Sequence, residues 1–285
     1  MADKAPLWLR TALLATLAMV AFAANSVLTR MALADTSMGA ASFTLIRILS
    51  GGLVLFALAG PRALTSGNWA GGASLLAYAG LFSFAYLGLG SGVGALILFF
   101  LVQITMVGWG LFQRKPLSLM QWSGLALACF SLVWLLLPGA EAPPIWAALI
   151  MAGAGISWGI YSLLGRNVSS PTNSTAGNFL RASVMAIILC PALFFLLGEP
   201  LPSWTGFAAA LASGALASGL GYALWYAVLP ALSTAQAGAL QLTVPVLAAL
   251  GGILFLSEPI TLTYILASAG ILTGVALVIL RPSRK

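Results

Sequence analysis

Three amide side chains stand inside long apolar stretches of the sequence: Asn25, Gln103 and Gln241. A buried amide that faced lipid would cost free energy, so each is expected to face protein or a polar path. Amides both donate and accept hydrogen bonds, so they can bind the ammonium and the carboxylate of a zwitterion. These residues therefore predict a binding site for a small polar molecule.

Aromatic side chains recur in the same stretches and are expected to complete this site. Their faces attract cations and stack on other rings. The alternative is that each Trp or Tyr near a helix end anchors that helix at the membrane interface. The candidates are, in chain order, Tyr78, Phe82, Trp109, Trp158, Tyr161, Tyr222 and Trp225. With the three amides, they form the predicted substrate-binding set.

Acid–base chemistry has few suitable groups in this sequence. It contains no histidine, and its five acidic residues fall at the predicted edges of apolar stretches, whereas catalysis needs a positioned proton acceptor or nucleophile. Cys129 and Cys190 lie in apolar runs without metal-ligand spacing. We therefore expect no enzyme and no cofactor. Proton coupling is not expected either, with Glu258 as the one weak candidate, so the substrate would move down its own gradient.

The stretches that carry these residues are long enough to cross a membrane. Hydrophobic residues make up 61% of the chain and charged residues 6%, against about a quarter charged in a soluble domain. Apolar runs without period-two alternation favour helices over a barrel. Ten helical spans are expected, near residues 7–28, 41–59, 72–89, 93–112, 119–137, 145–164, 177–197, 205–228, 231–256 and 260–280.

Three local features refine this picture. The polar segment 167–175 is expected to be a loop, and Pro245 is expected to remove a backbone hydrogen bond near the middle of the ninth span. A signal peptide cleaved after residues 21–23 (Ala-Phe-Ala) is an alternative for the first span. Close helix approach is expected at GxxxG pairs, with Gly124 and Ala128 of the fifth span facing residues 270–274 of the tenth. A homodimer contact is the rival use of these glycines.

Basic residues outnumber acidic ones by 12 to 5, which indicates orientation rather than nucleic-acid binding. Lys and Arg crowd the cytoplasmic loops of membrane proteins. With ten spans and a cytoplasmic N-terminus, only Arg30 and Arg47 fall on the outer side. Four acidic residues also fall there: Asp35, Glu141, Glu199 and Glu258. Both termini are therefore predicted to be cytoplasmic.

The two halves of the sequence resemble one another. Matching segments are residues 94–98 and 238–242, residues 45–47 and 179–181, and Arg30 and Arg166. Each half would hold five spans, an odd number, so the second would insert upside down. We expect two inverted repeats, residues 1–138 and 144–285, with the site between them and alternating access as the mechanism. A channel is the alternative, although no charged ring or filter-like segment is evident.

Three segments of the second half resemble a known family: residues 225–230 (Trp-Tyr-Ala-Val-Leu-Pro), 238–250 and 256–262 (Leu-Ser-Glu-Pro-Ile-Thr-Leu). They are similar to the drug/metabolite transporter superfamily, and more closely to bacterial ten-helix exporters with paired EamA domains. Residues 24–30 and Arg47 fit the same pattern. The first half departs from it, because Gln103 lies near a usual proline and residues 113–116 replace a Gly-Glu-Arg turn.

This resemblance implies an all-α integral membrane protein of the bacterial inner membrane. Its implied function is the export of small metabolites as a secondary transporter, most nearly of amino acids including aromatic ones. Efflux of multiple drugs or cationic compounds is the alternative. The implied partners are a small-molecule substrate and the lipid bilayer, without nucleic acid, and a monomer is expected.

Overall fold

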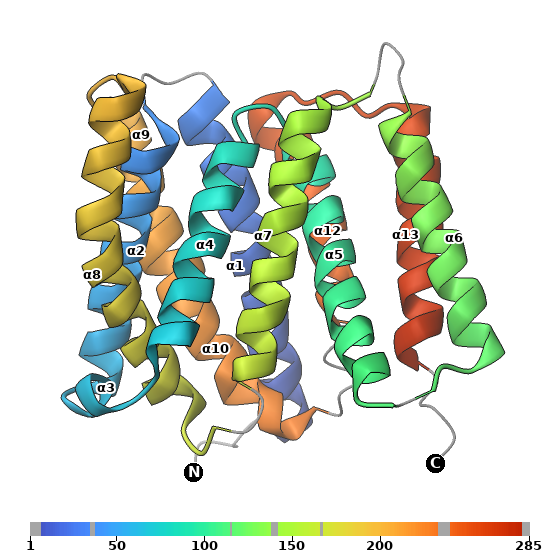
Figure 1. The fold of residues 1–285 in the computed structure, drawn as a ribbon, viewed down its shortest axis with the longest axis horizontal. Coiled ribbons are helices and arrows are strands. Elements are labelled where there is room, and N and C mark those ends of the chain that lie inside the picture. The colour runs from blue at the N-terminus through green and yellow to red at the C-terminus, as the bar shows by residue number, and fades with distance from the viewer. Residues whose placement is uncertain are drawn as a thin grey trace.

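The computed structural model describes residues 7–34, 38–114, 116–137, 142–165, 168–232 and 240–280, and nearly all of them are helical (Figure 1). Among these residues, eight helices are long and apolar enough to cross a membrane, and two shorter apolar helices, α4 and α12, accompany them. One long span is a composite of three segments: α9 (Trp204–Ala212), a π-helix η1 (Ser213–Leu220) and α10 (Gly221–Val228).

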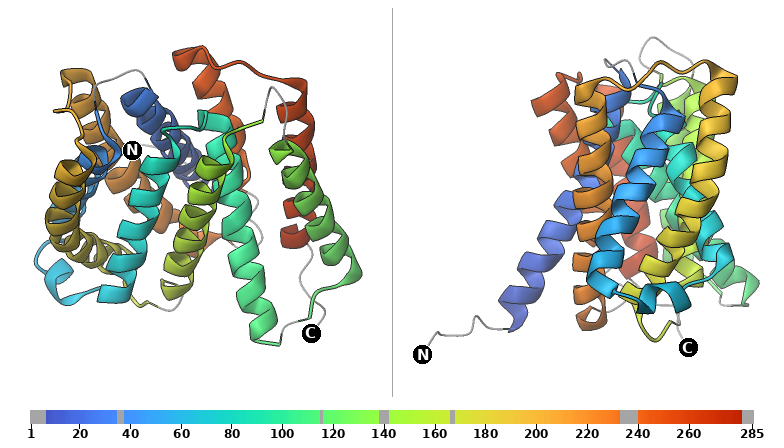
Figure 2. Two further views of the ribbon diagram at one scale, coloured as in Figure 1. Left: turned by 45° about the horizontal axis from the view of Figure 1, so that its top comes forward. Right: turned by 90° about the vertical axis from the view of Figure 1, so that its left-hand side faces the viewer.

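The remaining elements are single helices that stand side by side (Figure 1). They are α1 (Leu7–Ala34), α2 (Ala40–Ala59), α4 (Trp69–Ala85), α5 (Ser91–Phe112), α6 (Leu119–Leu136), α7 (Ile145–Leu164), α8 (Pro171–Leu197), α12 (Thr243–Leu256) and α13 (Leu262–Leu280). Short helices α3 (Arg62–Thr65) and η2 (Leu229–Ala231) occupy turns. The start of α1 and the end of α13 lie at the same end of the bundle (Figures 1 and 2).

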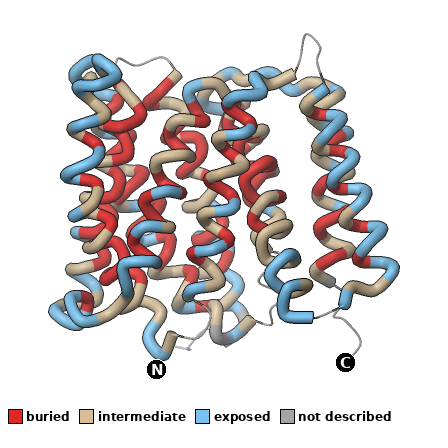
Figure 3. The backbone as a smooth tube through the Cα atoms, viewed as in Figure 1, coloured by how far each residue is buried: buried red, intermediate tan, exposed pale blue. Residues whose placement is uncertain are grey.

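The exterior of the bundle is apolar, as lipid contact requires. Figure 3 shows exposed positions along the outward faces of the peripheral helices α6 and α8. These positions carry large apolar side chains, among them Phe130 at 71% exposed and Ile188 at 73%. Exposed tryptophans stand at the first position of α4 (Trp69) and of α9 (Trp204), where membrane-interface anchors are expected. This is a multi-pass membrane protein.

Glycines set the closest helix contacts. A Cβ atom placed at Gly124 of α6 would lie 2.6 Å from the carbonyl oxygen of Gly274 in α13, and one at Gly274 would lie 2.8 Å from the backbone nitrogen of Ala128. The predicted pairing of these two spans is confirmed, although Gly270 meets Ser131 instead. Because Gly124 and Gly274 are buried within one chain, they are not free for the alternative homodimer contact.

The N-terminus of α8 corrects one prediction. The segment 167–175 was expected to be a loop, but the helix already begins at Pro171, while Asn167 lies outside the described residues. Proline favours the first helical position because its missing N–H has no helical partner there. The polar residues that follow are accommodated, since Thr175 is buried and accepts a hydrogen bond from the Tyr161 hydroxyl at 3.4 Å.

The ninth predicted span also differs from the observed structure. It was expected to run through residues 231–256 with Pro245 at its middle. The 3₁₀-helix η2 ends at Ala231, residues 233–239 lie outside the described part, and α12 begins at Thr243. Pro245 therefore stands in the first turn of α12, where the backbone N–H groups have no helical partner to lose.

Other boundaries shift for local reasons. The third span covers Trp69–Ala85 rather than residues 72–89, because the side chain of Asn68 caps it by accepting from the Gly71 amide at 2.7 Å. Helix α1 continues to Ala34, beyond the predicted end at residue 28. The sequence also gave no indication of the π-helix η1. The remaining described boundaries agree with the expected ones within two residues.

Candidate functional site

A buried arginine of α2 lies against α4 and the π-helix η1. Arg47 is the eighth residue of α2, and its side chain is 1% exposed. Small residues of α2 let neighbouring helices close over it: a Cβ atom at Gly51 would lie 2.8 Å from the Phe179 ring of α8. Charged side chains inside membrane helices are rare and mark functional positions.

The guanidinium of Arg47 is held by hydroxyls and aromatic faces. Its Nη2 donates to the Tyr78 hydroxyl at 3.1 Å, and its Nε donates to Ser218 Oγ at 3.3 Å. Its Cζ lies 4.8 Å from the centroid of the Phe82 ring and 5.2 Å from that of Tyr78, within the range of cation–π attraction. Among the described residues, Nη1 is buried without a hydrogen-bond partner. Leaving a buried donor unsatisfied costs about 1–3 kcal/mol.

The π-helix η1 supplies the Ser218 hydroxyl. Ser218 and Ser213 are both buried, and single-turn π-helical bulges often occur at functional sites. Gly214 permits the approach, because a Cβ atom there would collide with Ser50 Oγ and the Arg47 carbonyl oxygen. Asn25 of α1 links the two serines: it accepts from the Ser213 hydroxyl and donates to Ser218 Oγ at 3.4 Å.

Aromatic rings from four helices continue the site in an unbroken series of contacts. The Tyr78 ring of α4 lies 4.8 Å from Trp158 of α7, and Trp158 stacks on Tyr222 of α10 at 5.2 Å. Phe22 of α1 contacts Tyr222 and Trp225 at 5.6 and 6.0 Å. We call the following set the aromatic cluster: Phe22, Tyr78, Phe82, Trp158, Tyr161, Tyr222 and Trp225.

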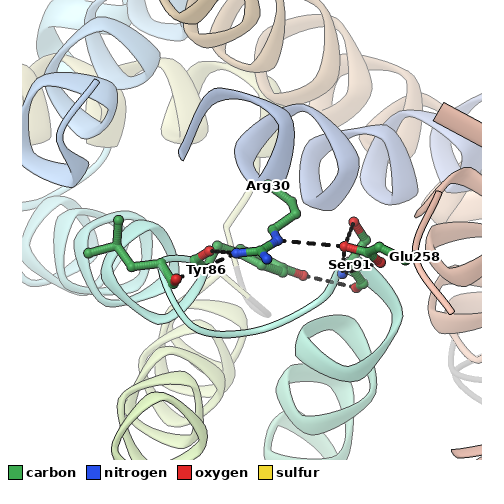
Figure 4. A network of polar contacts seen from close by, with 5 residues as sticks. Arg30, Tyr86, Ser91 and Glu258 are labelled. Atoms are coloured by element: carbon green, nitrogen blue, oxygen red, sulfur yellow. Dashed lines mark hydrogen bonds and ion pairs between the residues drawn. The ribbon is translucent and has the colours of Figure 1, made fainter. Parts of the chain in front are cut away.

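The described carboxylates are engaged elsewhere, at one end of the bundle. Glu258, in the turn before α13, accepts from the backbone N–H of Ser91 at 2.8 Å and lies 3.6 Å from Arg30 Nε (Figure 4). Arg30 Nη1 also donates to the Tyr86 carbonyl oxygen at 2.9 Å. Ser91 is the first residue of α5, so the carboxylate stabilises the positive end of that helix.

Glu199 does the same for α2. From the turn after α8, its carboxylate accepts from the backbone N–H of Ala41 at 2.8 Å and of Ser42 at 3.0 Å. The Ser42 hydroxyl adds a third hydrogen bond at 3.0 Å. The described residues therefore place no carboxylate beside Arg47. Asp3, Asp35 and Glu141 lie outside the described part, as do Arg166 and residues 238–239 of the predicted repeat motifs.

The predicted site residues divide into two groups. Seven of them belong to the arrangement just described: Asn25, Tyr78, Phe82, Trp158, Tyr161, Tyr222 and Trp225. Gln103 and Gln241 are half-buried, and among the described residues no hydrogen bond joins either of them to the aromatic cluster. Trp109 is 43% exposed and stacks on Phe112 at 5.5 Å.

Sequence reasoning missed Arg47, Ser213, Ser218 and Phe22 as site residues. Arg47 was used for orientation, for the sequence repeat and for the family resemblance, although a charge inside a predicted span is itself a signal of function. Ser213 and Ser218 carried a weaker signal, since hydroxyls are ordinary in apolar helices.

Long apolar helices around a buried polar and aromatic centre define a multi-pass membrane protein. Residues 145–280 match the EamA-like transporter family. The second half of the chain is therefore similar to the EamA-like transporter family, whose members are transporters and not enzymes.

Several relatives are similar over different lengths. The Pseudomonas aeruginosa protein described as uncharacterized protein PA1977 is 47% identical over 274 residues, which cover 95% of this chain and 94% of that protein. The threonine/homoserine exporter RhtA of Salmonella typhimurium is 30% identical over 168 residues, or 57% of this chain and 54% of RhtA. RhtA of Escherichia coli K12 is also 30% identical, over 165 residues. The matches thus span about half the length of RhtA.

A crystal structure described only as that of a protein has the same fold. It superposes with a TM-score of 0.67 at 19% identity, over 96% of this chain and 99% of the other. At this identity the likeness concerns the fold alone.

Proposed function

We propose that this protein is a secondary transporter of the bacterial inner membrane that exports amino acids, including aromatic ones, by alternating access. The observation that carries the proposal is the buried centre, where the aromatic cluster adjoins Asn25 and the Arg47 guanidinium. Hydrogen-bonding groups and aromatic faces together suit a zwitterion with an apolar or aromatic side chain. RhtA, which is similar over part of its length, is a threonine/homoserine exporter.

The proposed architecture is ten spans in two inverted repeats, residues 1–138 and 144–285. The helix neighbours support it, if α1, α2, α4, α5 and α6 correspond to α7, α8, α9–α10, α12 and α13. The contact between α4 and α7 then corresponds to the contact between α9–α10 and α1. In the same way, the contact between α5 and α7 corresponds to the contact between α12 and α1. Helices α2 and α8 pair with each other, as do α6 and α13. The shared end of α1 and α13 agrees with cytoplasmic termini (Figure 1).

Alternating access is supported by the carboxylates at one end of the bundle. Glu258 and Glu199 belong to the second repeat, and the helix starts that they cap belong to the first. Rocking of the two repeats would break these contacts, and under the proposed orientation they hold the outer side closed. Transporters with inverted repeats commonly move in this way around a site at the repeat interface.

Reconstitution into liposomes tests this function. Vesicles loaded with labelled L-phenylalanine or L-threonine should release label, and external unlabelled amino acid should accelerate the release by exchange. Vesicles with equal substrate on both sides should not accumulate it under a pH gradient, because no proton-coupling group is proposed. Failure to move either amino acid would contradict the proposed substrate class, and single-channel conductance in a planar bilayer would contradict alternating access.

A further inference from the structure

We propose that Arg47 binds the carboxylate of the transported molecule through its Nη1, so that the site selects substrates with a carboxylate over amides, esters and amines. The inference rests on the proposed function, since it concerns the same buried centre, and it names the group that the substrate must carry.

The first observation is the state of the guanidinium. Nε and Nη2 are bound to Ser218 and Tyr78, whereas the two N–H groups of Nη1 are buried without a partner among the described residues. Buried polar atoms of proteins nearly always have a hydrogen-bond partner, and an exception requires an explanation. A bound ligand supplies one.

The second observation is charge. Glu199 and Glu258 are bound to the starts of α2 and α5, away from Arg47. An arginine side chain carries a positive charge, so a substrate that enters beside Arg47 meets that charge. An anionic group is attracted there, and a cationic drug is repelled. Arg47 therefore argues against the efflux of cationic compounds.

The third observation is a contrast within the same chain. Arg181 of α8 matches Arg47 in the sequence repeat, yet its Nη1 donates to the Ser66 carbonyl oxygen at 2.6 Å and to that of Gly177 at 2.9 Å. Backbone oxygens thus satisfy one arginine of the pair. At the other, the corresponding nitrogen is left for a ligand.

Carboxylate fits this position better than phosphate does. The Tyr78 and Ser218 contacts fix the plane of the guanidinium, which suits the planar fork of a carboxylate. A phosphate carries more charge and would call for further cations. Two other arginines within the helices, Arg30 and Arg181, are bound to backbone oxygens.

The test measures binding to the purified full-length protein in detergent by titration calorimetry. The probes are L-phenylalanine, L-threonine and phenylacetate, each compared with its amide, and inorganic phosphate. The wild type should bind each acid about 10- to 100-fold more tightly than its amide, as expected for a charge-assisted hydrogen bond. It should bind phosphate weakly.

Arg47→Gln should lose the preference for acids, and the matched control Arg181→Gln should keep it. If Arg47→Gln does not fold, Arg47→Lys keeps the charge without the planar fork, and it should weaken acid binding while acids remain preferred. Equal binding of acid and amide by the wild type, an unchanged preference in Arg47→Gln, or no binding of any acid would overturn the inference.

Liposome transport separates this outcome from failure of the proposed function. Amino acid release that is independent of Arg47 would leave the function standing without the inference. Arg47-dependent binding without any release would leave the carboxylate site standing without the transport.

Discussion

Arg47 and Arg181 occupy matching positions under the proposed repeat, but their surroundings differ. Arg181 is half-buried, its Nη1 binds two backbone carbonyl oxygens, and its Cζ lies 5.9 Å from the centre of the exposed Trp69 ring. Arg47 is fully buried against hydroxyls and rings, with one nitrogen unpartnered. The contacts of Arg181 stabilise the packing of α8 against the turn before α4. The surroundings of Arg47 suit a binding group.

The helices around each arginine account for this difference. Arg181 packs beside the loop that contains Ser66, whose carbonyl oxygen is not used within a helix and can accept from a cation. Arg47 packs beside the π-helix η1, whose backbone approaches through Gly214 and presents Ser218. Under the proposed repeat, the same residue stands in both halves, and under the proposed binding role only Arg47 serves the site.

The largest expected effect separates the two arginines. Arg47→Gln should reduce amino acid release from liposomes by roughly 10- to 100-fold, because a hydrogen bond to a charged group contributes about 1.5–3 kcal/mol. Its stability should be retained, because the substitution removes a buried charge that has no ionic partner.

Arg181→Gln should do the reverse: it should lower the stability by about 1–2 kcal/mol through the loss of its carbonyl contacts. Release per folded molecule should stay near the wild-type value. Thermal unfolding in detergent and release assays on the same preparations provide both readings. Equal loss of transport in the two variants would remove the distinction drawn between the halves.

A smaller effect is expected in the aromatic cluster, which adjoins Arg47 and has no part in the surroundings of Arg181. Trp158→Leu should weaken binding of L-phenylalanine about 5- to 10-fold more than that of L-threonine, because an aromatic pair contributes about 0.5–1.5 kcal/mol beyond its buried area. Trp122, exposed on α6, offers a matched control as Trp122→Leu. A parallel loss for both amino acids would indicate that the cluster packs the helices without selecting the substrate.

The contacts between the halves should have a smaller effect still. Glu258→Gln should weaken the closure at the start of α5 and change the rate of release by about two- to fivefold, since partly exposed ion pairs contribute up to about 1 kcal/mol. A cysteine placed at Ser91 should become more reactive toward a membrane-impermeant thiol reagent in this background.

Ser118→Ala is the control for that change, because it removes a helix cap within the first half alone. It should cost about 1 kcal/mol of stability and leave the labelling unchanged. Unaltered labelling in Glu258→Gln would show that this contact does not hold the two halves together.

The smallest effect is expected at the two glutamines. Gln103→Leu and Gln241→Leu should each lower release, but by less than Arg47→Gln, because both side chains are half-buried and lie outside the aromatic cluster. A loss as large as that of Arg47→Gln would move the site toward α5 and α12. Wild-type release from both folded variants would exclude the glutamines from the pathway.

The sequence by itself determined the class and most of the helices. Some 20 consecutive apolar residues in lipid must satisfy their backbone hydrogen bonds internally, and a helix does so within one segment. Local chemistry also explains where sequence reasoning failed at the ends. Asn68 capped a helix earlier than hydropathy suggested, and Pro171 began one inside a polar segment.

Only the tertiary structure decided what the site residues do. Residue type alone pointed to Asn25, Tyr78 and Trp158, because amides and aromatic rings have limited uses inside a membrane. Whether a given side chain meets another depends on helix rotation and on the glycines that let helices approach, which no single helix specifies. The π-helix η1 is the clearest case, since its extra residue per turn alters the face on which Ser213 and Ser218 lie. That packing left one nitrogen of Arg47 without a partner and bound Arg181 to the backbone.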